Sequence, residues 1–74
     1  MIFTVSRTNV SEYGDVSPCE EARKLRVNDL DSVWVIDIEN LAQLMEFQSK
    51  YGDVIIREGS LGWYHLEIYD ADRE

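Results

Sequence analysis

The chain has 74 residues, a mass of 8.6 kDa, 45% apolar residues and a formal net charge of −8. This length fits one domain over residues 1–74 and excludes two. Fifteen acidic residues against seven basic ones argue against direct binding to nucleic acid or to an anionic membrane. With one cysteine, no internal disulfide can form. The sequence has neither a long apolar run nor a signal-peptide pattern, so we expect a soluble, cytoplasmic protein.

The first part of the chain predicts one strand and one short helix. Residues 2–7 alternate in hydropathy and are rich in β-branched and aromatic types, which predicts a strand. Residues 8–16 carry turn-forming types and predict a loop. Ser17-Pro18-Cys19-Glu20 matches the start of a helix, with a hydroxyl to cap it, and predicts a short helix over 18–25.

The rest of the chain predicts a strand, a helix and a hairpin. Residues 33–38 are apolar on both faces, which is typical of a central strand. Asn40 and Gln43 have the spacing of a capping box before a helix over 41–51, which Gly52 ends. Residues 53–58 and 63–70 predict two further strands, and the glycine-containing segment 59–62 predicts a hairpin turn between them.

Together these elements predict a small α+β domain in the order β-α-β-α-β-β, with a mixed four-stranded sheet, one main helix and one short helix. The strands 33–38 and 53–58 should run parallel, joined by a right-handed crossover through the helix. In the last strand, Leu66 and Ile68 face the core side, while His65 and Glu67 face the other side. That second side is either covered by the segment 8–25 or left open as a contact surface, and the sequence does not decide between them.

The negative charge is confined to one part of the chain. Residues 1–26 contain four acidic and four basic residues, whereas residues 27–74 contain eleven acidic and three basic ones. One interpretation is a surface that keeps the domain soluble. The other is an acidic face that meets a basic cleft in a partner protein.

No enzymatic, metal or cofactor signature stands out, so we expect a non-enzymatic protein without cofactor or metal. Cys19 near a helix start, with His65 as a base, is a weak candidate for thiol chemistry; a small buried cysteine is the commoner outcome. Asp29 and Asp31 lack the glycine and the distal glutamate of a calcium loop. No glycine-rich segment leads into a helix to hold a phosphate.

Several segments resemble small, acidic, mostly uncharacterised proteins of phages and prophages of Gram-positive bacteria. They are Phe3 to Thr8, Pro18 to Ala22, Trp34 to Ile38 continuing into 41–52, and Leu66 to Glu74. The related proteins often carry an insertion before the central strand, which this chain lacks. The resemblance implies a phage setting, in which small acidic proteins frequently antagonise host defence, and it supplies no catalytic residues.

From the charge and this setting we expect a protein that inhibits a host nucleic-acid-handling protein, of the anti-CRISPR or anti-restriction type. Its acidic surface would mimic DNA and occupy a basic cleft of that host protein. An alternative is a structural or assembly module, with a homodimer formed through an exposed sheet face or an edge strand. The expected partner-binding residues are acidic side chains and aromatic anchors, namely Asp37, Glu39, Glu58, Trp63, Glu67, Tyr69, Asp70 and Asp72.

Overall fold

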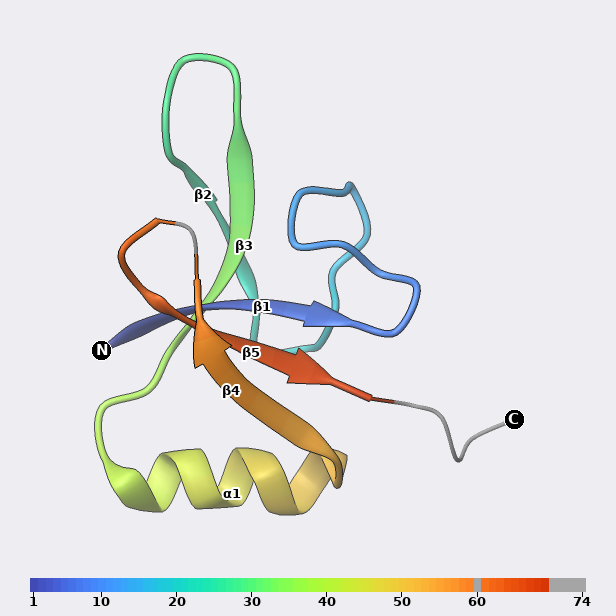
Figure 1. Cartoon of the computed structure of the whole chain (residues 1–74), viewed down its shortest axis with the longest axis vertical. Coiled ribbons are helices and arrows are strands. Elements are labelled where there is room, and N and C mark those ends of the chain that lie inside the picture. The colour runs from blue at the N-terminus through green and yellow to red at the C-terminus, as the bar shows by residue number, and fades with distance from the viewer. Residues whose placement is uncertain (60, 70–74) are drawn as a thin grey trace.

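A computed structural model of the chain describes residues 1–59 and 61–69. It shows a single α+β domain with one helix and a five-stranded mixed sheet (Figure 1). The elements are β1 (Ile2–Arg7), β2 (Arg23–Arg26), β3 (Ser32–Asp37), α1 (Leu41–Tyr51), β4 (Val54–Glu58) and β5 (Tyr64–Ile68). No helix in the described ranges has the length and apolarity that crossing a membrane requires.

The sheet has the strand order β2-β3-β1-β5-β4, which places β1 at its centre. β1 pairs with β3 antiparallel and with β5 parallel, while β2 and β4 are outer strands, antiparallel to β3 and β5 respectively. β3 and β4 therefore run in the same direction, as predicted, but two strands separate them. The chain crosses from one to the other through α1, on one side of the sheet (Figure 1).

The predicted helix over 18–25 is wrong, and the order is β-β-β-α-β-β with five strands instead of four. The Ser17 hydroxyl donates to the carbonyl oxygen of Cys19 at 2.6 Å instead of capping a helix, and residues after it form turns. Residues 23–26 then pair with β3 from Arg23↔Val35 to Arg26↔Ser32. A helix of eight residues has little stability of its own, so the ladder along an otherwise unpaired edge of β3 is favoured.

The main helix begins and ends at the predicted residues. Asn40 has an extended backbone, and its side-chain oxygen accepts a hydrogen bond from the Gln43 N–H at 2.9 Å. The Gln43 side chain in turn accepts from the N–H of Glu39 at 2.7 Å, one residue before the cap. Gly52 ends the helix with φ 81°, the left-handed region that favours glycine.

The core lies between α1 and one face of the sheet. It joins residues of β1, β3 and β5 to the buried Phe47 of α1 and to Cys19, and its members are Phe3, Val5, Cys19, Ile36, Ile38, Phe47, Leu66 and Ile68. On the opposite face, side chains of β1, β3 and β5 are buried as well, namely Thr4, Ser6, Val33, Val35 and His65.

The second face of the sheet is covered at its centre and open at the outer strand β4. In Figure 1 the loop after β1 and the turn between β4 and β5 lie on the side of β1 and β5 away from α1. The centre of that face is covered. The outer strand β4 is different, because Ile55 and Arg57, which share this face with Glu67 and His65, are both exposed.

Candidate functional site

The predicted partner-binding residues do not form one cluster. The start of β1 and the ends of β3 and β4 meet at one end of the sheet, because Ile2 pairs with Asp37, and Tyr64 lies between Phe3 and Glu58. Asp37, Glu39, Glu58 and Trp63 belong to this end. Glu67 lies within β5, and Tyr69 follows β5 at the opposite end. Asp70 and Asp72 lie outside the described residues.

Three carboxylates at this end are exposed and have no ion pair with any other described residue: Glu39, Glu46 and Glu58. We call them, with Asp37, the acidic end. Glu46 was not predicted; it lies on α1 and lines a shallow groove of about 360 Å³ together with Asp37. Its position follows from the helix crossing beside β3, which spacing along the sequence does not reveal.

Asp37 differs from its neighbours because a cation on the adjacent strand binds it. The Arg23 guanidinium donates to both carboxylate oxygens, at 2.8 and 3.3 Å. This hydrogen bonding, with a smaller contribution from the α-amino group, lowers the pKa of Asp37. The Asp37 carboxylate is therefore partly neutralised within the chain, and the unpaired charge of the acidic end comes from the three glutamates.

Exposed apolar side chains adjoin the acidic end. The side chains of Met1 and Leu41 are 70% and 69% exposed, and both line a second shallow groove of about 250 Å³ beside Glu39. The α-amino group of Met1 donates to the carbonyl oxygen of Ile38 at 2.9 Å, which fixes this corner of the sheet. Neither Met1 nor Leu41 was predicted, because a terminal methionine and the first residue of a helix carry no distinctive pattern.

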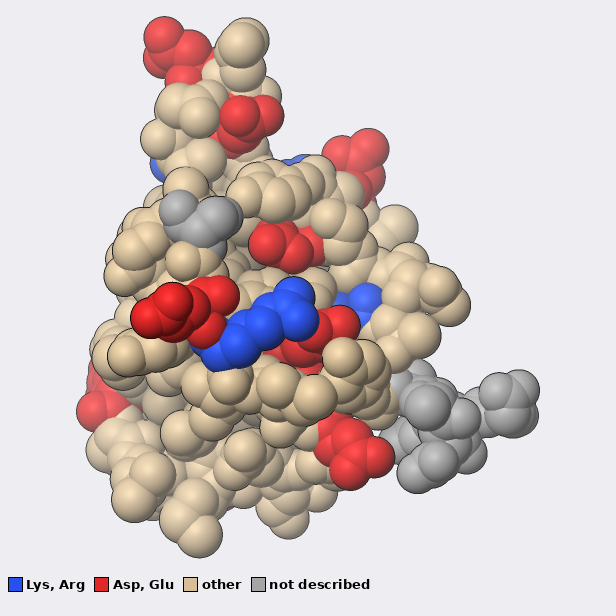
Figure 2. All heavy atoms as spheres, viewed as in Figure 1, with Lys and Arg blue, Asp and Glu red and all other residues tan. Residues whose placement is uncertain are grey.

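The acidic residues elsewhere are more dispersed. Figure 2 shows the carboxylates of one face in several separate groups, with basic side chains between them, so this face carries no continuous acidic patch. Asp29 and Asp31 lie in the connection between β2 and β3, far along the sheet from the acidic end. The negative charge of the chain is thus divided among several surfaces.

Glu67 serves as an internal partner. Its Oε1 lies 2.7 Å from Nη1 of Arg57 on β4, and its side chain is only 19% exposed. Reversing its charge would break this contact between two neighbouring strands as well as alter the surface. Of the predicted aromatic anchors, Trp63 is half-buried and Tyr69 is 38% exposed.

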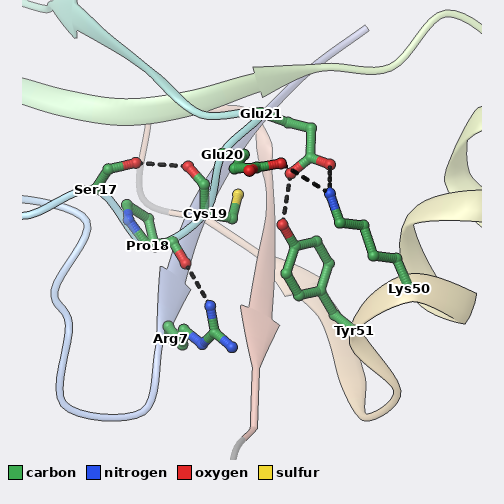
Figure 3. Close-up of polar contacts among 8 residues, drawn as sticks. All are labelled: Arg7, Ser17, Pro18, Cys19, Glu20, Glu21, Lys50 and Tyr51. Atoms are coloured by element: carbon green, nitrogen blue, oxygen red, sulfur yellow. Dashed lines mark hydrogen bonds and ion pairs between the residues drawn. The ribbon is translucent and has the colours of Figure 1, made fainter.

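A second group of charges joins the connection before β2 to the end of α1 (Figure 3). Lys50 contacts the carboxylates of Glu20 and Glu21 at 3.2 and 2.8 Å, and the Tyr51 hydroxyl donates to Glu21 at 2.7 Å. Hydrogen bonds from Lys50 and Tyr51 lower the pKa of Glu21, although partial burial opposes this. These contacts hold the turn at residues 19–22 over the core.

Cys19 is the first residue of that turn, and its thiol has an environment unlike that of a catalytic thiol. It is buried, and desolvation, together with the Glu21 carboxylate, raises its pKa. Reactive cysteines instead have a lowered pKa and some exposure. Cys19 packs in the core on the α1 side of the sheet, whereas His65 is buried on the opposite face.

His65 is the centre of a buried polar group between β1 and β5. Its Nδ1 lies 2.7 Å from the Thr4 hydroxyl and its Nε2 lies 2.8 Å from the Ser6 hydroxyl. A neutral imidazole has one donor and one acceptor nitrogen, and a hydroxyl can be either, so both ring nitrogens are satisfied. The nearest carboxylate oxygen, on Glu12, is 3.9 Å from Nδ1.

We expect the domain to lose stability as the pH falls from 7 to 5.5, because the buried His65 resists protonation in the folded protein. His65 is the only histidine, so the effect can be assigned to it. Burial lowers the pKa of His65, and Arg57 adds to this, while the carboxylates of Glu12 and Glu67 oppose it. The unfolded chain therefore binds a proton first, near its ordinary pKa of about 6.5. Each tenfold difference in proton affinity between the unfolded and the folded protein can lower the free energy of unfolding by up to about 1.4 kcal/mol.

Urea unfolding at pH 7 and 5.5 measures this loss, and an NMR titration of the imidazole carbon Cε1 measures the pKa of His65 directly. A pKa of 6.5 or higher in the folded protein would contradict the expectation.

No protein-family model, curated protein or solved structure matches the chain. The site is therefore defined by its own geometry: three carboxylates without an ion pair among the described residues, and two exposed apolar side chains, at one end of the sheet.

Proposed function

We propose that the chain is a non-enzymatic, phage-encoded binding protein that inhibits a host nucleic-acid-handling defence protein of the anti-CRISPR or anti-restriction type. In this proposal the acidic end occupies a basic cleft that otherwise holds nucleic acid. The single observation that carries it is the set of unpaired, exposed carboxylates of Glu39, Glu46 and Glu58 beside exposed Met1 and Leu41.

The spacing of these groups supports contact with several cations at once. Asp37 and Glu58 end strands three positions apart in the sheet, a separation of about 14 Å at the usual distance between strands. Carboxylates held across such a width form charge-assisted hydrogen bonds with lysine and arginine, and they accelerate encounter with a basic surface. The adjoining Met1 and Leu41 side chains would supply the apolar contact that charge pairs at a rim do not.

The charge balance supports a basic partner more than a nucleic acid. Most cations of the described residues already contact carboxylates or carbonyl oxygens within the chain, as Arg23, Arg26, Lys50 and Arg57 show. Of the acidic end, Glu39, Glu46 and Glu58 have no such partner among the described residues, whereas Asp37 is paired with Arg23. A surface of this kind attracts a protein that binds nucleic acid and repels nucleic acid itself.

Cleavage and DNA-binding assays with purified restriction and CRISPR nucleases, with and without the protein, test the proposal. We expect at least one nuclease to be inhibited, with an affinity that falls as the salt concentration rises. Absence of any effect on cleavage or DNA binding across both classes would overturn it.

The double charge reversal Glu39→Lys with Glu58→Lys should weaken binding to the inhibited nuclease by about tenfold or more, because each reversal replaces an attraction by a repulsion. The matched control reverses Asp29 and Asp31, which are exposed in the connection between β2 and β3 and distant from the acidic end, with the same change in net charge. We expect the control to retain most of the affinity. Equal losses in both variants would show that only the total charge matters and would contradict the assignment of this site.

A further inference from the structure

The open edge of the sheet at β4 leads to a second inference, which does not depend on the proposed inhibition. β4 pairs with β5 on one side, and no described strand lies on its other side. Ile55 and Ile56 on this strand are 44% and 42% exposed. Natural proteins usually protect such an edge, because unpaired backbone groups beside apolar side chains form a template for another strand.

The hydrogen bonds at the two ends of the hairpin identify the backbone groups that remain free. Gly59 donates its N–H to the carbonyl oxygen of Trp63 at 2.8 Å. At the other end, Tyr69 donates its N–H to the carbonyl oxygen of Asp53 at 2.8 Å. In an antiparallel ladder, alternate residues turn these groups to opposite sides. The residues that turn their N–H and C=O groups toward the open edge are therefore Val54, Ile56 and Glu58.

We infer that β4 pairs antiparallel with β4 of a second copy of this chain, around a two-fold axis that passes Ile55. This register places Ile55 opposite Ile55, Val54 opposite Ile56, and Asp53 opposite Arg57. The outward backbone groups of Val54 then meet those of Ile56. The two Ile55 side chains and both Asp53–Arg57 pairs occupy positions without backbone hydrogen bonds, where side chains come closest.

Other registers of the same edge are less favourable. An axis past Ile56 places Arg57 opposite Ile55 and Glu58 opposite Val54, so two charged side chains lose any charged partner across the interface. An axis between two residues sets outward backbone groups against inward ones and breaks the ladder. Self-complementarity of charge therefore selects both a second copy of this chain and the register.

Arg57 can serve both its own chain and the second copy. One of its terminal nitrogens contacts Glu67 at 2.7 Å, and its side chain is still 56% exposed. A guanidinium has five N–H donors, so bonds to Asp53 of the second copy need not displace Glu67. The net charge of −8 on each copy opposes association, which makes salt near the physiological 0.15 M the appropriate condition.

Analytical ultracentrifugation of the full chain over a range of concentrations tests the inference. We expect a reversible species of twice 8.6 kDa. Ile55→Lys sets two like charges against each other at the two-fold axis and should weaken dimerisation by about tenfold or more. Leu30→Lys is the matched control, because Leu30 is 93% exposed in the connection between β2 and β3 and receives the same change. A monomer at every concentration, or a dimer that Ile55→Lys leaves intact, would overturn the inference.

Disulfide trapping tests the register even if Ile55→Lys alters the fold. In the Ile55→Cys variant, the Cα atoms of the two cysteines lie about 4.5 Å apart across the two-fold axis, within the range that a disulfide spans. We expect this variant to form covalent dimers faster than Ile56→Cys, whose cysteine lies opposite Val54. The native Cys19 is buried and common to both variants. Faster crosslinking through position 56 would replace the proposed register with the one centred on Ile56, and equal slow rates would exclude both.

Discussion

The Leu66→Ala variant should lose about 2–5 kcal/mol of its free energy of unfolding. Leu66 lies in β5 with no exposed surface, between Val5 on β1 and Ile56 on β4. Removing its branched end leaves a cavity where β1, β5 and α1 meet. A domain of this length has a total stability of about 4–11 kcal/mol, so the substitution removes a large share of it.

Urea unfolding followed by tryptophan fluorescence measures this change, and Leu30→Ala is its control. Leu30 is 93% exposed and undergoes the same chemical change without a cavity, so we expect a difference from the native protein of less than about 0.5 kcal/mol. Similar losses in the two variants would mean that the β5 face toward α1 is not the centre of the core.

Replacing His65 by leucine should have the second large effect, of about 1–3 kcal/mol for each hydroxyl left without a partner. Thr4 and Ser6 are 2% and 8% exposed, and both their hydroxyls contact the imidazole. A leucine of similar size removes both contacts while water stays excluded. The loss of stability therefore comes from buried hydroxyl groups that have lost their hydrogen-bond partner, and not from lost volume.

A triple variant separates these two causes. Thr4→Val and Ser6→Ala, added to His65→Leu, remove the hydroxyl groups together with their partner, and we expect most of the lost stability to return. The pair Thr4→Val and Ser6→Ala in the presence of His65 completes the cycle. If the triple variant is no more stable than His65→Leu alone, the cost arises from packing and the polar group is not responsible.

Local patterns predicted most individual elements, the shared direction of β3 and β4 and the hairpin of β4 and β5, but not the pairing of β2 with β3. The alternation of residues 2–7 and the cap at Asn40 depend on neighbours in the sequence, and both β1 and α1 have the predicted bounds. Residues 18–25 carry equally clear helix-start signals, yet residues 23–26 form an outer strand. The decisive interaction, pairing with β3, lies outside the segment and has no local signature.

The candidate site was predicted only in part, for the same reason. The excess of acidic residues in 27–74 is visible in the sequence, and Asp37, Glu39 and Glu58 do meet at one end of the sheet. The ion pairs that neutralise Asp37 and Glu67 depend on which strands are neighbours. The exposure of Met1 and Leu41 depends on where α1 crosses the sheet, and neither feature can be obtained from spacing.

The parallel pairing of the first and last strands also determines when the domain can form. Phe3 lies opposite Tyr64, and Arg7 lies opposite Ile68, so the central strand completes its ladder only after residues 64–68 have been made. During translation β1 can pair with β3 alone, and its other edge stays unpaired until β5 has been made. Contacts this distant in sequence slow folding. A ribosome stalled before residue 64 would therefore hold a chain with an open central strand, exposed to chaperones and proteases.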